Sequence, residues 1–205
     1  MHGSNHDHAF WTDRNMEHLT FISQDLSTMS GSEPWIDRAS ELQTQWNALK
    51  YLNFNPELVV EMRYFLNAVK PHLQGCEPDL IDHMLLELQF YQNLMEGTLT
   101  PETELQFWLQ EHKSALDYVK CNLPQESPLQ LQLSETVLNF TALPQNAPFQ
   151  TMILRENYLL LAQINLQQQN RRLGLGLPDD RLTHEHQETE YARGRMIQYT
   201  LMGYP

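Results

Sequence analysis

Two pairs of histidine and glutamate have a spacing that suits the binding of a metal ion. His83 and Glu87 are four residues apart, and so are His186 and Glu190. In an α-helix, residues four positions apart lie on one face, so each imidazole would stand beside its carboxylate. Imidazole nitrogen and carboxylate oxygen can both ligate a divalent ion. The spacing therefore indicates a candidate metal-binding pair in each half of the chain.

The neighbours of the first pair predict that it faces the protein core. His83 and Glu87 share one helical stripe with the apolar residues Leu80, Met84 and Leu88. A carboxylate at the border of a core needs a partner, and a metal ion is one candidate. The alternative is a simple hydrogen-bonded pair at the helix surface, and the residues leave both interpretations open.

Further ligands must come from other helices at the same depth. The first helix offers a histidine and the third a glutamate, so the predicted first site comprises His18, Glu61, His83 and Glu87. The second half offers a less regular set, and the predicted second site comprises His112, Glu156, His186 and Glu190. The donors in both sets are nitrogen and oxygen, which are typical ligands of iron and manganese.

A short stretch near the start of the chain recurs 97 residues later. Phe10 and Trp11 match Phe107 and Trp108, and each pair follows an acid by three residues. These large aromatic side chains are expected to anchor the core. The recurrence indicates that the chain consists of two tandem repeats.

The two copies differ at the candidate ligand of the first helix. Ala115 occupies the position that matches His18, and the nearest histidine, His112, lies three residues earlier. A shift of three residues keeps roughly the same face of a helix. The second repeat has therefore either moved its histidine by about one turn or kept only the fold.

Helical periodicity runs through the whole chain and predicts an all-α protein. Proline, glycine and cap residues divide it into eight helices, at about 7–29, 34–52, 56–73, 78–95, 101–122, 128–143, 149–173 and 179–201. Short connections favour antiparallel neighbours, as in helical bundles. We therefore expect two four-helix repeats, residues 1–98 and 99–205, packed together as one compact unit.

Composition and charge limit the partners that the chain is expected to have. The 26 acidic residues outnumber the 13 lysines and arginines, which gives a formal charge of -13. Such a charge disfavours nucleic acids and anionic membrane surfaces. The sequence contains no apolar run long enough for a transmembrane helix, and the two cysteines show no paired spacing. These features predict a cytoplasmic protein with neither a nucleic-acid nor a membrane partner, and they leave a homo-oligomer open.

The two Phe-Trp helices, the Glu17-His18 step and the His83-x-x-x-Glu87 pattern resemble a bacterial ferritin-like family catalogued as a domain of unknown function. This resemblance spans most of the chain. It implies a ferritin-like or hemerythrin-like antiparallel bundle with a metal site between helices, and it carries no established activity. Ferritin-type diiron bundles use Glu-x-x-His on two helices, a pattern that this sequence lacks.

The leading hypothesis is a metal-binding protein that holds iron or manganese, and any catalysis would then be that of an oxygen- or peroxide-linked oxidoreductase. The alternative is a metal-free helical scaffold or protein-interaction module. His2, His6 and His8 are expected to lie in a flexible start and to have no functional role.

Overall fold

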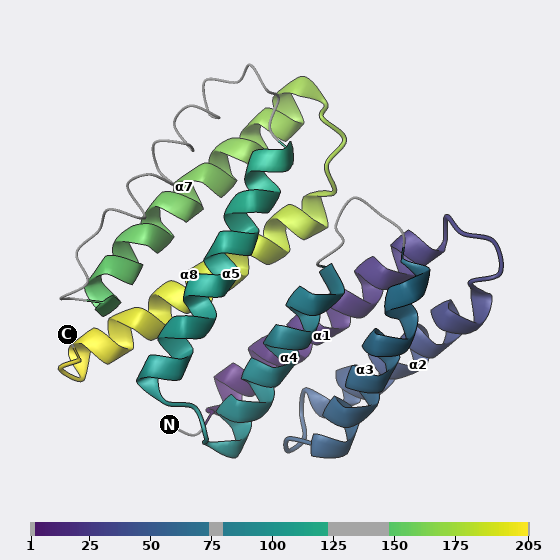
Figure 1. Cartoon of the computed structure of the whole chain (residues 1–205), viewed down its shortest axis with the longest axis horizontal. Helices are drawn as coiled ribbons and strands as arrows, with labels where there is room; N and C mark the ends of the chain where they lie inside the picture. The colour runs from purple at the N-terminus through teal and green to yellow at the C-terminus, as the bar shows by residue number, and fades with distance from the viewer. Residues whose placement is uncertain (1–2, 74–79, 123–147, 205) are drawn as a thin grey trace. The chain divides into compact units, whose positions relative to one another are not determined.

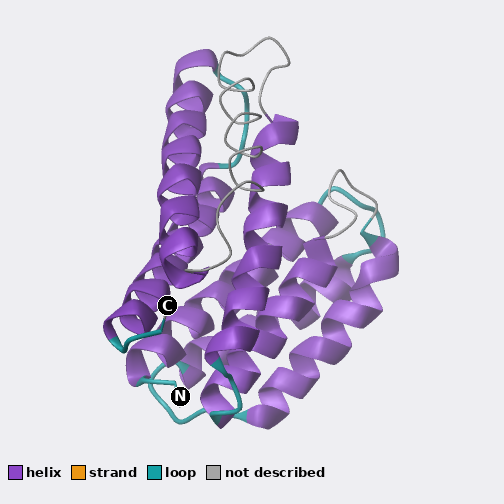
Figure 2. Ribbon diagram, turned by 60° about the vertical axis from the view of Figure 1, so that its left-hand side comes forward, coloured by secondary structure: helices purple, strands orange, loops and turns teal. Residues whose placement is uncertain are grey.

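The computed structural model describes residues 3–73, 80–122 and 148–204, without the side chains of 112–114 and 116–122. The regular structure of these residues is entirely helical, as Figure 2 shows. The α-helices are α1 (Asn5–Leu26), α2 (Glu33–Leu49), α3 (Pro56–Val69), α4 (Leu80–Glu96), α5 (Pro101–Asn122), α7 (Pro148–Leu173) and α8 (Asp179–Leu201). The all-α prediction is confirmed, and the helix expected at about 128–143 lies outside the described residues.

The observed helix ends follow from local sequence. A capping box starts α1, in which the Ser4 hydroxyl accepts from the Asp7 N–H and the Asp7 carboxylate accepts from the Ser4 N–H. Asn55 caps α3 ahead of Pro56, and its side-chain oxygen accepts from the N–H groups of Glu57 and Leu58. α3 ends at Val69, earlier than expected, and continues as a 3-10 turn, because a proline at position 71 cannot donate a helical hydrogen bond.

The chain divides into two units, Met1–Thr100 and Pro101–Pro205. In the first unit, α1 packs against α2 and α4, and α3 packs against the same two helices. Figure 1 shows these four helices as one bundle, coloured from purple to teal. Each helix turns an apolar stripe inward, and the fully buried residues include Trp11, Leu19, Ile22, Leu42, Trp46, Met62, Met84 and Tyr91.

In the second unit, the described helices α5, α7 and α8 all contact one another. The turn between α7 and α8 is held by Asn170, whose amide donates to the Leu177 carbonyl at 2.8 Å and accepts from the Leu177 N–H at 3.0 Å. Farther along these helices, Arg193 donates to Asn157 at 2.7 Å. These contacts fix the register of α7 against α8.

Each unit has the same kind of aromatic contact between its first and last helices. The ring centroids of Trp11 and Phe90 are 5.2 Å apart in the first unit, and those of Trp108 and Tyr191 are 6.0 Å apart in the second. The two tryptophans are the residues that recur in the sequence. Position 90 of α4 thus corresponds to position 191 of α8.

A buried ionic network joins α5 to α8. Arg195 binds the Glu104 carboxylate with two hydrogen bonds of 2.7 and 2.6 Å, and the Tyr199 hydroxyl donates to the same carboxylate at 2.5 Å. The indole N–H of Trp108 donates to Glu104 at 3.4 Å. All four side chains are buried. Such bidentate, fully hydrogen-bonded pairs are strong and directional.

Removal of the Glu104 carboxylate should destabilise the protein, because Arg195 would keep its charge in the core without a counter-charge. We expect Glu104→Ala to lower the free energy of unfolding by about 3–5 kcal/mol in urea titrations. The exposed Glu190 provides a control, and Glu190→Ala should change stability by no more than about 0.5 kcal/mol.

A double variant, Glu104→Leu with Arg195→Met, should recover most of that loss, since it removes both charges together. Losses that simply add in the double variant would show that the two side chains are not energetically coupled.

Candidate metal centre

The centre of the first unit is a carboxylate held between two imidazoles. Glu87 lies on the buried stripe of α4, and His83 precedes it by one turn on the same helix. His18 comes from the facing stripe of α1. Glu87 and His18 are each 1% exposed, whereas the His83 side chain is 13% exposed. The helix stripes that build the core therefore also bring these three side chains together.

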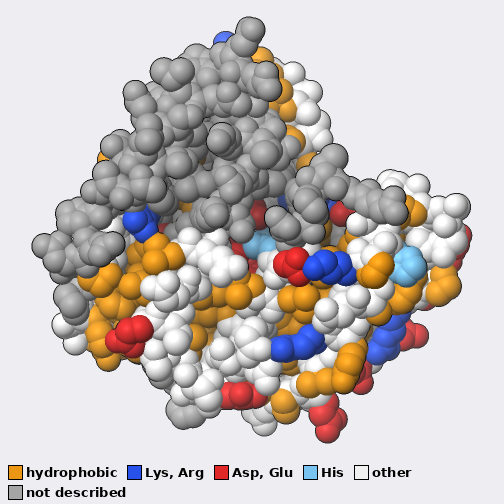
Figure 3. Space-filling model, viewed as in Figure 1, with side chains coloured by type: hydrophobic (Ala, Val, Ile, Leu, Met, Phe, Trp, Pro, Cys, Tyr) orange, Lys and Arg blue, Asp and Glu red, His pale blue; other side chains and the backbone are white. Residues whose placement is uncertain are grey.

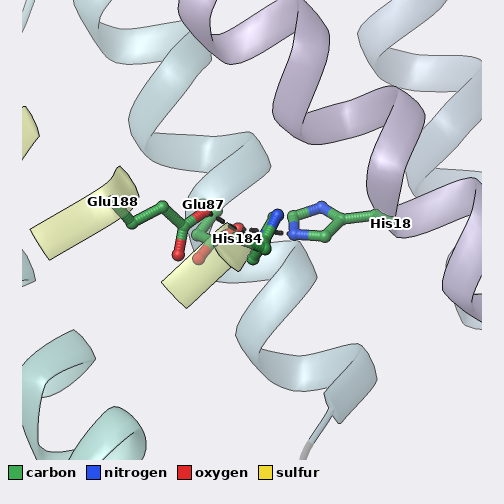
Figure 4. A group of neighbouring side chains, drawn as sticks. All are labelled: His18, Glu87, His184 and Glu188. Carbon is green, nitrogen blue, oxygen red and sulfur yellow. Dashed lines mark ion pairs between the residues drawn. The ribbon is translucent and has the colours of Figure 1, made fainter. Parts of the chain in front are cut away.

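The two imidazoles approach different oxygens of Glu87. The His18 Nε2 atom lies 3.0 Å from Oε2, and the His83 Nε2 atom lies 2.8 Å from Oε1. Figure 4 shows the first of these contacts, with the His18 ring pointing from α1 toward the Glu87 carboxylate on α4. The two ring centroids are 6.5 Å apart. Glu87 is therefore the central member of the cluster, with one ring at each oxygen.

The two nitrogen–oxygen distances suit hydrogen bonds, but the direction of an N–H bond on either imidazole does not. Neither oxygen of Glu87 accepts a hydrogen bond of acceptable direction from a described residue. Two ligand atoms that are each about 2.1 Å from a metal ion and at right angles to one another would be about 3.0 Å apart. A nitrogen and an oxygen at this separation can therefore serve as two ligands of one ion. Each imidazole, taken together with Glu87, is thus spaced as a pair of metal ligands.

The electrostatics keep Glu87 ionised. Burial raises the pKa of the Glu87 carboxyl, but the neighbouring charges of His83 and His18 oppose burial and hold this pKa well below its usual range. A carboxylate must be deprotonated to ligate a metal ion. The carboxylate is therefore in the form that ligates a metal ion, and the two imidazoles have to release their protons to join it.

The second unit contains a buried pair of the same kind, but not at the expected residues. His184 Nε2 lies 2.9 Å from Glu188 Oε1, with side-chain exposures of 3% and 8%. The predicted pair, His186 and Glu190, is 3.7 Å apart, and its side chains are 30% and 63% exposed. Figure 4 also labels His184 and Glu188, which belong to α8.

The buried pair could have been recognised from the register of α8. Both pairs have the same spacing and overlap within seven residues, so spacing alone cannot separate them. The buried stripe of α8 runs through His184, Glu188, Tyr191 and Arg195, which are four, three and four residues apart. Tyr191 corresponds to Phe90 by its contact with tryptophan, and this correspondence aligns His184 with His83 and Glu188 with Glu87.

Several other predicted ligands lie elsewhere. Glu61 is exposed and forms an ion pair with Arg38 at 3.2 Å, so it does not join His18 and Glu87. Ala115 is buried on α5, where the first unit has His18. The side chain of His112 lies outside the described residues. The buried His/Glu groups that the structure does form could hold a metal ion.

Glu156, another predicted ligand, is buried by itself. It is 0% exposed, and neither of its oxygens has a hydrogen-bond partner among the described residues. Among those residues, it also belongs to no group of ligand atoms within 4.8 Å of one another. Burial raises the pKa of Glu156 to about 9; the charge of Arg193 acts against this rise and that of Glu104 adds to it. Glu156 is therefore a neutral acid at pH 7.

No family model matches the chain, and no curated protein or solved structure matches it. None of the helices in the described ranges combines the length and apolar character that a membrane span requires. On the described part of the face in Figure 3, lysine and arginine side chains are dispersed among acidic and neutral ones. Because no known protein matches, the chemistry of the centre is inferred from its own side chains.

The buried acid should make stability depend on pH. The pKa of Glu156 is about 9 in the folded protein and 4.5 as its ordinary value, so folding favours the protonated form. The resulting stabilisation is complete below the ordinary pKa and is lost as the pH rises toward the folded value, by up to about 1.4 kcal/mol per pH unit. We expect Glu156→Gln to remove this slope and to be more stable than the wild type at pH 8, as measured by urea unfolding across the pH range.

The matched control is Glu190→Gln, which replaces an exposed acid on α8 and should keep the slope. An unchanged slope in Glu156→Gln would mean that Glu156 is ionised in the folded protein at neutral pH.

Proposed function

We propose that the protein binds divalent transition metal, of the iron or manganese kind, at Glu87 with His18 and His83. The observation that carries this proposal is the buried Glu87 carboxylate, whose two oxygens each have an imidazole nitrogen within 3.0 Å. Burial of a carboxylate is costly unless the charge is compensated. A cation ligated by these groups would compensate it.

The donor set favours a particular group of metals. Two imidazoles and one carboxylate are ligands of intermediate and hard character, and this combination is found with non-haem iron and related ions. Only two cysteines occur in the chain, at positions 76 and 121, so a thiolate-rich site is disfavoured. Iron or manganese, when bound, would supply one-electron redox chemistry. We therefore propose an oxygen- or peroxide-linked oxidoreductase as the activity class.

Glu87 has the disposition of a bridging ligand. His18 and His83 approach opposite oxygens, and among the described residues each histidine has its ligand atom within 4.8 Å of one in Glu87, in a group that does not include the other histidine. A carboxylate in this position can use its two oxygens for two ions. We infer that Glu87 is the ligand on which metal binding in the first unit depends most.

The role of His184 and Glu188 follows by comparison. The pair occupies the positions of His83 and Glu87 in the second unit and is similarly buried. We propose that it also ligates metal. This assignment supports membership in a ferritin-like family of two tandem helical repeats, as do the matched Trp11–Phe90 and Trp108–Tyr191 contacts.

The competing function is that of a metal-free helical scaffold or interaction module. One observation favours it: the lowered pKa of Glu87 is what a buried ion pair with protonated His83 and His18 would produce, even though burial alone raises that pKa. In this case the three side chains would serve only to connect α1 with α4.

Metal content separates the two functions. We expect untagged wild-type protein to carry stoichiometric iron or manganese in elemental analysis by plasma mass spectrometry. Glu87→Gln preserves the side-chain shape but removes the charge. It should lower metal affinity by more than about 100-fold, since even the loss of a residue that only supports a ligand costs about 10–100-fold. Glu61→Gln, which changes an exposed acid of α3, should retain the metal.

Within α8, His184→Ala and His186→Ala form a second matched comparison, because one histidine is buried beside Glu188 and the other is half-buried at the surface. Only His184→Ala should reduce the metal content. Bound metal should also raise the free energy of unfolding, by about 2.7 kcal/mol at a free metal concentration of 100 times Kd. Metal-free protein whose stability does not respond to chelators or added metal would establish the scaffold function instead.

A further inference from the structure

A second buried histidine in the first unit is paired with a tyrosine. His8 of α1 is 4% exposed and Tyr91 of α4 is 0% exposed. The Tyr91 hydroxyl lies 2.9 Å from His8 Nδ1, and His8 Nε2 lies 3.0 Å from the Leu49 carbonyl oxygen at the end of α2. The expectation that His8 belongs to a flexible start was wrong, because the capping box at Ser4 starts α1 ahead of it.

The Leu49 carbonyl determines where the hydrogens lie in the row of hydrogen bonds from Tyr91 through His8 to Leu49. A carbonyl oxygen can only accept a hydrogen bond, so His8 Nε2 must carry a hydrogen and donate it. In a neutral imidazole, Nδ1 then has a free lone pair, and the Tyr91 hydroxyl donates to it. The phenol proton thus points at a base that can take it up.

Burial makes a simple loss of this proton unfavourable. Burial raises the pKa of Tyr91, although a hydrogen bond with Thr12 acts against this effect, so a phenolate is disfavoured. Removal of an electron together with the proton leaves the phenol ring neutral, and the charge of the proton passes to the His8 imidazole. The surroundings are aromatic, with ring centroids of Trp46 and Phe54 at 5.7 and 5.5 Å from that of Tyr91.

The second unit shows that helix packing does not require this pair. The registers set by Trp108 and Tyr191 place Leu105 at the position of His8 and Ala192 at the position of Tyr91. The corresponding aromatic contact between the helices is nevertheless present. The histidine and tyrosine therefore occur only in the unit that also contains Glu87 between two imidazoles, and Tyr91 follows Glu87 by one turn of α4.

We propose that Tyr91 is a redox-active tyrosine and that His8 is its proton acceptor. The phenol ring loses one electron to an oxidant, a transition-metal ion in its higher oxidation state, which is reduced by one electron. The O–H bond of Tyr91 breaks as an N–H bond forms at His8 Nδ1. The products are a neutral phenoxyl radical and an imidazolium, which keeps its hydrogen bond from Nε2 to the Leu49 carbonyl. The proposal goes beyond metal binding and does not depend on it.

The test uses the full chain after removal of metal by a chelator, with photogenerated ruthenium(III) tris(bipyridine) as the oxidant. Transient absorption follows the radical, and electron paramagnetic resonance of frozen samples identifies it. We expect a long-lived tyrosyl radical that is lost in Tyr91→Phe and retained in Tyr64→Phe, which changes a tyrosine that is 74% exposed. Persistence of the long-lived signal in Tyr91→Phe would overturn the assignment.

His8→Gln tests the proton acceptor, because an amide can accept the phenol hydrogen bond but cannot take up the proton. The rate of Tyr91 oxidation should fall by about 100-fold in this variant, as expected for the loss of a positioned base. An unchanged rate would show that His8 has only a structural role.

A measurement on the wild type keeps the proposal testable if a variant fails to fold. Electron–nuclear double resonance in deuterated buffer should detect an exchangeable deuteron hydrogen-bonded to the phenoxyl oxygen. Its absence would contradict proton transfer to His8. Because the metal is removed beforehand, none of these outcomes depends on the metal-binding proposal.

Discussion

The constraint on which the first unit depends is the burial of the Glu87 carboxylate. Its charge lies in a core of leucine, methionine and aromatic side chains, and two imidazoles from α1 and α4 approach it. This arrangement requires α1 to face α4 in one register, since a shift of one helical turn would remove His18 from the carboxylate. The capping box at Ser4 and the Trp11–Phe90 contact support that same register. Local sequence, aromatic packing and the ionic cluster therefore specify the same helix pairing.

Three buried acidic side chains of the protein are accommodated in three different ways. At the start of α5, Glu104 is neutralised by Arg195 and fully hydrogen-bonded, as in a structural ion pair. Glu156 on α7 has no hydrogen-bond donor among the described residues, and burial raises its pKa to about 9. Glu87 has imidazole nitrogens close by without directed hydrogen bonds. Of these three acids, only Glu87 is both ionised and close to further ligand atoms, which is why burial alone does not identify a candidate metal ligand.

Much of the fold could be predicted from the sequence, because helix periodicity and cap residues act locally. The predicted helix at 179–201 agrees with α8 to the residue, and the apolar stripes of α1 and α4 correctly place His18, His83 and Glu87 together. The prediction was less successful where several side chains satisfy the same spacing. His184–Glu188 and His186–Glu190 have the same spacing and differ in which pair faces the core. Glu61 lies on the exposed side of α3, whereas His18 lies on the buried side of α1. These distinctions depend on the rotation of each helix against its neighbours, which is a tertiary property. His8 was misjudged for a related reason, because the cap that orders it involves just two residues.

The distribution of tryptophan gives each unit its own optical signal. Three of the four tryptophans, at positions 11, 35 and 46, belong to the first unit, and Trp108 alone belongs to the second. Trp108 is 2% exposed and its indole N–H meets a carboxylate, so its fluorescence will change when water enters that core. A chain in which the other three indoles are replaced by phenylalanine would therefore report the opening of the second unit by itself. Trp108 thus makes it possible to observe whether the two units unfold together in one cooperative transition or in separate steps.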